Sequence, residues 1–121
     1  MPIIIPPLSC RNFDSHSDTI KEDFVKWHEK ALAAAKDTGA DYLNLITAST
    51  DYINVIGVDN AATYDLSEGD GTHINEKAGI VFSRMVADLL LEKREDLAVY
   101  ISENEELSEK IENGEYATGD K

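Results

Sequence analysis

The sequence predicts an α/β protein with a parallel sheet, and two observations carry this prediction. The first is the order of apolar patterns along the chain, which runs strand, helix, strand, helix, polar loop and helix. Such alternation is typical of helices layered on a parallel sheet. The second is the β-branched run Ile3–Ile5, which carries no polar alternation and ends at Pro6 and Pro7. An unbroken apolar run of this length fits a strand that is buried on both faces.

The first helix is expected to run from Thr19 to Lys36. Apolar residues recur there at helical spacing, and Gly39 supplies a stop in the sequence. Asp18 or Thr19 is expected to cap its start, with Glu22 in the first turn. The apolar residues of its inner face are Ile20, Phe24, Trp27, Ala31, Leu32 and Ala35.

A second strand and a second helix follow. The apolar run Tyr42–Ile46 predicts the strand. Thr47 or Ser49 is expected to begin the helix, and Gly57 is expected to end it. This strand is expected to lie beside the first one, because the intervening helix makes a crossover between parallel neighbours.

A polar loop, Asp59–Gly71, precedes the third helix. This helix is expected to start at Asn75 or Glu76, with Asn75 in the usual role of an N-cap. Its inner residues are Ile80, Val81, Met85, Val86, Leu89 and Leu90. Beyond them we expect a short edge element over Leu97–Ile101 and a short acidic helix over Glu103–Asn113.

Two strands do not make a self-sufficient parallel sheet, because each buried face needs neighbouring strands and covering helices. Residues 1–93 are therefore expected to form the C-terminal portion of a larger domain, and residues 94–121 an acidic C-terminal extension of it. The alternative is a complete small α/β protein that dimerises to finish its sheet. In either case an uncovered apolar sheet edge predicts self-association.

The composition excludes some partners. The chain has 121 residues, 42% of them hydrophobic, and a formal net charge of −13. Binding to nucleic acid or to an anionic membrane surface needs clustered Lys and Arg, so neither is expected. No apolar stretch is long enough to span a membrane. The opening residues lack the pattern of a signal peptide, and the sequence leaves the compartment open.

One cysteine, Cys10, is present, so the chain cannot form an intrachain disulfide or supply a thiol pair to a metal. Arg11 beside it would favour the thiolate and lower the pKa of the thiol. An incidental thiol is nevertheless the favoured interpretation. No metal or other cofactor is expected.

The stretch from Gly69 to Asn75 carries the chemistry. Asp70 and His73 lie three positions apart just before the third predicted helix. An Asp so placed accepts the Nδ1–H of the imidazole and leaves Nε2 free as a general base. The alternative is an Asx-turn or capping role for Asp70 and a surface-loop position for His73. Thr72 between them is expected to hold the loop through its hydroxyl.

A nucleophile for this base is missing from the sequence. Four serines are candidates in principle, but none lies in a Gly-x-Ser-x-Gly or Gly-Asp-Ser context: Ser9, Ser15, Ser49 and Ser67. The chain therefore holds a base and its orienting acid without a recognisable hydroxyl to activate.

The segment Asp70–His73 resembles the Asp-x-x-His block of the SGNH (GDSL-type) hydrolases. Further segments resemble the rhamnogalacturonan acetylesterase branch of that superfamily, namely residues 7–9, 11–13, 39–45, 75–77, 82–90, 108–111 and 114–117. The chain departs from the branch at Ala78–Gly79, where the family usually has Gly first. It also lacks the Gly-Asp-Ser nucleophile block and the Gly and Asn blocks that donate to the oxyanion.

The resemblance implies a fold, a reaction and a substrate. The fold would be the C-terminal part of a flavodoxin-like three-layer αβα sandwich. The reaction would be Ser-His-Asp ester hydrolysis, with His73 as base and Asp70 as its partner. The substrate would be an acetylated pectin or rhamnogalacturonan polysaccharide, or another small ester. The chain alone is expected to hydrolyse esters poorly. The alternative is a non-catalytic fragment or interaction module that retains the final elements of the fold.

Overall fold

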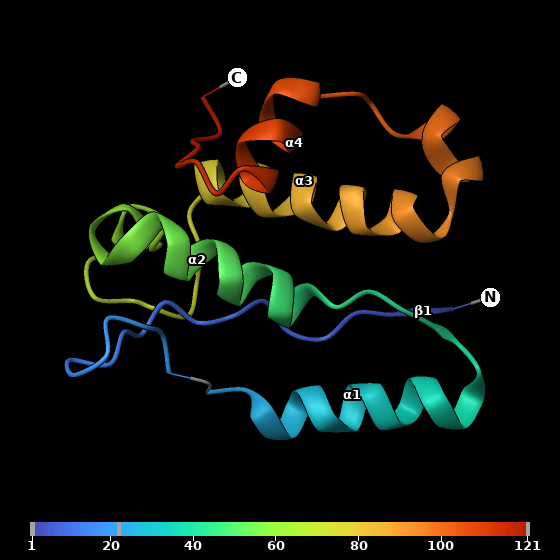
Figure 1. Ribbon diagram of the computed structural model, residues 1–121, viewed down its shortest axis with the longest axis horizontal. Coiled ribbons are helices and arrows are strands. Elements are labelled where there is room, and N and C mark those ends of the chain that lie inside the picture. The colour runs from blue at the N-terminus through green and yellow to red at the C-terminus, as the bar shows by residue number, and fades with distance from the viewer. Residues whose placement is uncertain (1, 22, 121) are drawn as a thin grey trace.

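The computed structural model describes residues 2–21 and 23–120, so the predicted first-turn position of Glu22 lies outside the described residues. Helices and strands alternate at the start of the chain, and helices alone follow (Figure 1). The elements are β1 (Ile3–Ile4), α1 (Val25–Thr38), β2 (Asp41–Tyr42), α2 (Leu45–Ala62), α3 (Glu76–Lys93), the 3-10 helix η1 (Glu95–Tyr100) and α4 (Glu105–Glu112). The protein is thus of mixed α/β class.

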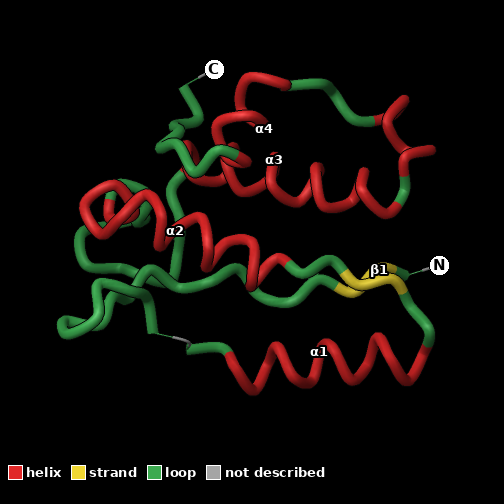
Figure 2. Tube along the Cα trace, in the orientation of Figure 1, coloured by secondary structure: helices red, strands yellow, loops and turns green. Residues whose placement is uncertain are grey.

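The two strands pair in parallel, as predicted. Ile3 lies opposite Asp41 and Ile4 opposite Tyr42, and within the described part of the chain the sheet has these two strands (Figure 2). The prediction that the second strand reaches Ile46 is wrong. The chain leaves the sheet after the Leu43 N–H donates to the Ile4 carbonyl at 3.0 Å. The next residues already begin α2, whose N-cap Asn44 accepts a hydrogen bond from the Thr47 N–H.

Helix α1 starts at Val25, so the predicted start at Thr19 is wrong. The reason is a local turn, in which Phe13 and Ile20 form an antiparallel bridge and the Asp14 N–H donates to the Thr19 carbonyl at 2.7 Å. Asp18 lies in the turn with a φ of 53° rather than at a helix cap. The turn places Ile20 in the core instead of on a helix.

The end of α1 agrees with the prediction, because Gly39 adopts a left-handed conformation with a φ of 67° at the C-cap. Its predicted apolar face does not. Trp27 was expected in the core, but it is 61% exposed, and Ala35 is the buried residue among the described residues of α1. Figure 1 shows α1 on one side of β1 and the pair α3 and α4 on the other.

Helix α2 is interrupted at Gly57, the predicted end of the second helix. This residue has φ 84° and ψ 169°, a conformation that is essentially restricted to glycine. The helix resumes beyond this kink and ends at Ala62, so the polar loop begins later than the sequence predicted.

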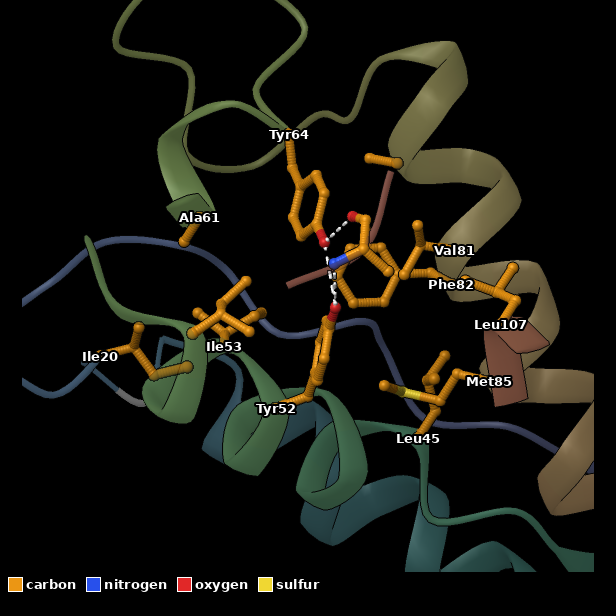
Figure 3. Close-up of a cluster of buried hydrophobic side chains, with 13 residues drawn as sticks. Ile20, Leu45, Tyr52, Ile53, Ala61, Tyr64, Val81, Phe82, Met85 and Leu107 are labelled. Atoms are coloured by element: carbon orange, nitrogen blue, oxygen red, sulfur yellow. Dashed lines mark hydrogen bonds between the residues drawn. The ribbon is translucent and has the colours of Figure 1, made fainter. Parts of the chain in front are cut away.

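The hydrophobic core lies between α2, α3 and α4 (Figure 3). Three rings form its centre, with Phe82 in edge-on contact with Tyr64 at 5.4 Å and with Tyr52 at 6.3 Å between ring centroids. The Tyr64 hydroxyl donates to the Ala117 carbonyl at 2.5 Å, and the Tyr52 hydroxyl accepts from the Ala117 N–H at 3.1 Å. The C-terminal segment is therefore fixed to the core by both tyrosines.

Helix α3 begins as predicted, with Asn75 as its N-cap, and α4 falls within the predicted acidic helix. Of the predicted inner residues of α3, Val81 and Met85 are buried, whereas Ile80 is 38% exposed. The predicted edge element over residues 97–101 is wrong. The chain forms the 3-10 helix η1 there, and Val99 and Tyr100 are both more than 80% exposed.

Candidate functional site

The predicted site residues lie on the loop between α2 and α3, which we call the site loop (residues 64–75). Two backbone hydrogen bonds close its base. The Asn75 N–H donates to the Tyr64 carbonyl at 3.0 Å, and the Leu66 N–H donates to the His73 carbonyl at 3.1 Å. Between them Asp65 and Ile74 form an antiparallel bridge. The end of α2 and the start of α3 therefore position the loop directly.

Asn75 has two functions at this junction. Its side-chain oxygen accepts from the Ala78 N–H at 3.0 Å and caps α3. Its side-chain amide donates to the carbonyls of Thr63 and Asp65, at 2.8 and 3.1 Å. One side chain thus fixes both the first turn of the helix and the base of the site loop.

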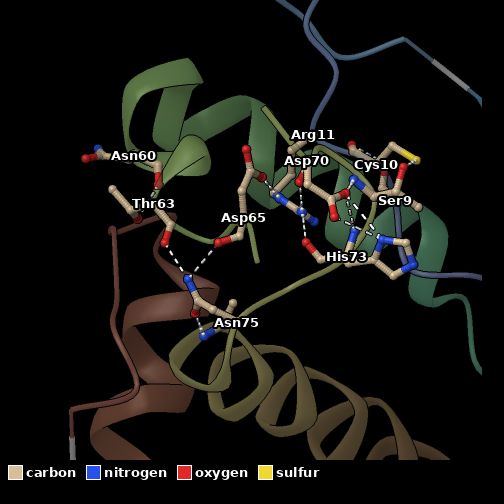
Figure 4. A network of polar contacts seen from close by, with 11 residues as sticks. Ser9, Cys10, Arg11, Asn60, Thr63, Asp65, Asp70, His73 and Asn75 are labelled. Carbon is tan, nitrogen blue, oxygen red and sulfur yellow. Dashed lines mark hydrogen bonds and ion pairs between the residues drawn. The ribbon is translucent and has the colours of Figure 1, made fainter. Parts of the chain in front are cut away.

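The Asp70 carboxylate contacts the His73 imidazole, as the sequence predicted (Figure 4). Nδ1 of His73 lies 3.1 Å from Oδ2 and 3.3 Å from Oδ1 of Asp70. Oδ1 also accepts from the backbone N–H groups of Thr72 and His73, each at 3.0 Å. Gly69, just before the acid, has a φ of 81°, which L side chains rarely adopt. The backbone of the turn therefore orients the carboxylate independently of its contact with the ring.

Backbone hydrogen bonds keep this acid ionised. The N–H groups of His73 and Thr72 lower the pKa of Asp70 below its ordinary value, and the His73 ring adds to the effect. A carboxylate held in this way accepts the Nδ1–H and leaves Nε2 as the basic nitrogen. The His73 side chain is 70% exposed, and no described residue forms a hydrogen bond with Nε2.

Arg11 lies beneath the site loop and was not predicted as a site residue. Its Nε donates to Oδ1 of Asp65 at 2.7 Å, and its Nη2 donates to the carbonyl oxygens of His73 at 2.6 Å and Asp70 at 3.2 Å. Its side chain is fully buried. Because these partners lie more than fifty positions away, no local pattern could have revealed them. The available signal was position, since Arg11 follows the predicted strand Ile3–Ile5 and ligand sites form beyond strand ends.

Two of the candidate nucleophiles, Ser9 and Cys10, are engaged elsewhere. Ser9 is buried, and its hydroxyl donates to the Cys10 carbonyl and accepts from the Thr50 hydroxyl. Burial raises the pKa of the Cys10 thiol, so the lowering expected from Arg11 is outweighed. Thr72 contacts this sulfur, with its Oγ1 at 3.8 Å. Within the described residues no hydroxyl or thiol forms a hydrogen bond with the His73 ring.

Among the described residues no group of three or more His, Cys, Asp or Glu side chains is placed to hold a metal ion. The helices described are too short or too polar to cross a membrane.

Fold and site together define an α/β protein with an exposed Asp–His pair. No protein-family model, curated protein or solved structure matches the chain.

Proposed function

We propose that the chain supplies the base and its orienting acid to a serine-type ester hydrolase of the SGNH kind. The observation that carries this proposal is the Asp70 carboxylate, which is held by two backbone N–H groups and accepts from Nδ1 of His73 at 3.1 Å. In a Ser-His-Asp site the acid has this task, because it selects the tautomer whose Nε2 is basic. The large exposure of the ring leaves that nitrogen open to a partner.

The reaction would be acyl transfer in two steps. A serine hydroxyl from polypeptide outside this sequence would attack the acetyl carbonyl while its proton passes to Nε2 of His73. His73 would return that proton to the departing sugar oxygen. Water would then give a proton to Nε2 and attack the acyl carbon, and the proton would return to serine as acetate leaves. Oxyanion donors would also come from outside the chain.

The substrate class rests on the resemblance. An acetylated pectin or rhamnogalacturonan is proposed because segments along most of the sequence resemble that acetylesterase branch. The parallel pair of β1 and β2, with α1 and α3 on opposite sides, is compatible with the last portion of a flavodoxin-like three-layer sandwich. Nucleic acid and anionic membranes stay excluded as partners on charge grounds, since the net charge is −13.

A second candidate function is a non-catalytic fragment or interaction module. The observation that favours it is the His73 ring, whose hydrogen bonds within the described residues are confined to Asp70. Under this alternative the carboxylate closes an Asx-type turn and the histidine is a surface residue. The two candidate functions differ in whether Nε2 of His73 accepts the proton of a nucleophilic serine.

The test is complementation with p-nitrophenyl acetate as substrate. The full chain would be mixed with a separately expressed N-terminal half of an SGNH acetylesterase that carries Gly-Asp-Ser and the oxyanion blocks. We expect little turnover by either piece alone and turnover by the mixture. Loss of the correct tautomer costs about 10⁴-fold in a Ser-His-Asp enzyme, so Asp70→Asn should lower the restored rate by that order.

The matched control is His16→Ala, because His16 is an exposed loop histidine remote from Asp70 in the sequence. It should leave the restored activity unchanged, whereas His73→Ala should abolish it. Restored turnover that survives His73→Ala would disprove the assignment of the base. Stable association of the two halves without any turnover would favour the interaction module. If turnover depends on His73, deacetylation of acetylated rhamnogalacturonan would then test the substrate class.

A further inference from the structure

We infer that Arg11 is a positioning residue for the Asp70–His73 pair, because one guanidinium nitrogen holds the backbone of both residues. Nη2 of Arg11 donates to the carbonyl oxygen of His73 at 2.6 Å and to that of Asp70 at 3.2 Å. The inference rests on the proposed function in that the pair is the proposed base and acid. The positioning itself is measurable without any turnover.

An ion pair at the base of the site loop fixes the direction of the guanidinium. Its Nε forms an ion pair with Oδ1 of Asp65 at 2.7 Å, and the arginine side chain is fully buried. Asp65 belongs to the base of the site loop, where it pairs with Ile74. Arginine presents its donors in a rigid planar fork, so anchoring Nε also sets the direction of Nη2. A lysine at this position would provide the charge without the fork.

The backbone at Arg11 contacts the same loop. The Arg11 N–H donates to the Gly71 carbonyl at 2.8 Å. The approach is so close that a Cβ on Gly71 would lie 2.1 Å from Oδ1 of Asn12. A side chain at position 71 would therefore force the Asn12 side chain to move away from the turn between Asp70 and His73.

The guanidinium is not optimised for stability. Nη1 of Arg11 is buried and has no hydrogen-bond partner among the described residues. An unsatisfied buried donor costs free energy, which a smaller apolar side chain would avoid. The donors that are used converge on three residues of the site loop, namely Asp65, Asp70 and His73. This distribution fits a group whose effect is the geometry of that loop.

The inference predicts a spectroscopic change when the fork is lost. Asp70 accepts from Nδ1 of His73, so the neutral ring is expected to carry its proton on Nδ1. Arg11→Lys retains the charge but cannot hold Asp65 and both carbonyls together. We expect the ring to shift toward the Nε2–H tautomer, which ¹⁵N NMR of labelled histidine reports. The pKa of the Asp70 carboxyl should rise toward its ordinary value as the N–H contacts loosen.

The chain offers a matched control in Arg84→Lys. Arg84 also pairs with one carboxylate, that of Asp88, and donates to one backbone carbonyl, that of Ser102, but away from the site loop. This variant should leave the His73 tautomer and the Asp70 titration unchanged. Asp65→Asn is the second test if Arg11→Lys does not fold, and it should shift both readouts in the same direction by a smaller amount.

The outcomes separate this inference from the proposed function. A folded Arg11→Lys chain with the wild-type tautomer and titration would overturn the positioning role. A shift of equal size in Arg84→Lys would overturn it too, because the effect would then be general loosening. Failure of the complementation assay, with the tautomer still dependent on Arg11, would reject the esterase and leave the positioning role intact. A tautomer shift in Arg11→Lys and Asp65→Asn, with Arg84→Lys unchanged, would support the fork geometry.

Discussion

The two sides of the β1–β2 pair are built differently. Helix α1 covers one side and buries Ala35 alone among its described residues. On the other side, α3 buries Ala78, Val81, Phe82 and Met85, and the continuous core draws its members from α2, α3, α4 and adjoining loops. The difference teaches that most of the buried core lies on the side of α2, α3 and α4, which we call the helical side. On the α1 side, Val25 and Trp27 are exposed, and so is Ile5 just after β1.

The site loop belongs to the helical side. It joins α2 to α3, and Tyr64 at its start is one of the most deeply buried residues of the core. Exposed apolar side chains occur on both sides of the strand pair, with Val25 and Trp27 on α1 and Val55 and Val58 on α2. Damage to the helical side should therefore disturb the site, and damage to α1 should spare it.

Phe82→Ala is the largest change that we predict. The ring contacts both Tyr52 and Tyr64 and is 3% exposed, so its removal leaves a cavity at the centre of the core. A loss of about 3–5 kcal/mol in the free energy of unfolding is expected. Urea denaturation followed by circular dichroism measures it. A loss below about 1 kcal/mol would contradict the central place of this ring.

Tyr64→Phe tests the polar part of the same core. The substitution removes the hydroxyl that donates to the Ala117 carbonyl and leaves that acceptor buried, at an expected cost of about 1–3 kcal/mol at pH 7. Hydrogen exchange of the segment around Ala117 should increase as well. Unchanged stability would mean that water replaces the hydroxyl without loss.

The same tyrosine gives a pH dependence with a definite sign. Burial, the Tyr52 hydroxyl and neighbouring charges raise the pKa of Tyr64 above its ordinary value of 10.0, and burial also raises that of Tyr52. The contribution of the buried tyrosine hydroxyls to the free energy of unfolding is fully present below pH 10, where both the folded and the unfolded state hold the proton. Above it the unfolded tyrosines lose protons first, so stability falls as pH rises. In Tyr64→Phe this alkaline fall, measured by denaturation between neutral and alkaline pH, should be shallower.

Gly69→Ala has a smaller expected effect, confined to the site loop. The residue has a φ of 81° with open space where a Cβ would lie, so the cost is conformational rather than steric. About 1–2 kcal/mol is expected for a left-handed alanine. If the turn relaxes to avoid this strain, the amide resonances of Thr72 and His73 should shift. Gly79→Ala, at a helical position with equal space, is the control and should show no loss.

The sequence predicted those parts of the fold that depend on local interactions. The start of α3 at Asn75 and the left-handed stop at Gly39 each need only nearby residues. The start of α1 was missed because Ile20 joins a bridge with Phe13 and enters a core formed mostly by distant helices. Helical spacing records which residues share a face, but it does not record whether another element covers that face.

The same division applies to the candidate site. Asp70 and His73 were predictable because three positions and a glycine turn bring them together. Arg11 was not, since its contacts with residues 65, 70 and 73 arise when the segment after β1 meets the site loop. The lowering of the Cys10 pKa by Arg11 was a wrong expectation for the same reason, although the favoured interpretation of an incidental thiol is not contradicted. Its neighbour Arg11 is visible in the sequence, but the burial that raises its pKa is not.

Trp27→Ala is the smallest change that we predict, and it sharpens the comparison most directly. The indole is 61% exposed, and Nζ of Lys30 lies 6.0 Å from its ring centroid. An exposed cation–π contact contributes about 0.5 kcal/mol, so the free energy of unfolding should change by no more than that. Because Trp27 is the one tryptophan, its fluorescence in the folded wild type should resemble that of an indole in water. A blue-shifted emission that turns red on dilution would show that a second copy covers α1 in solution, and the α1 side would then be an interface. A blue shift independent of concentration, with a loss of several kcal/mol on substitution, would instead contradict the division between the two sides.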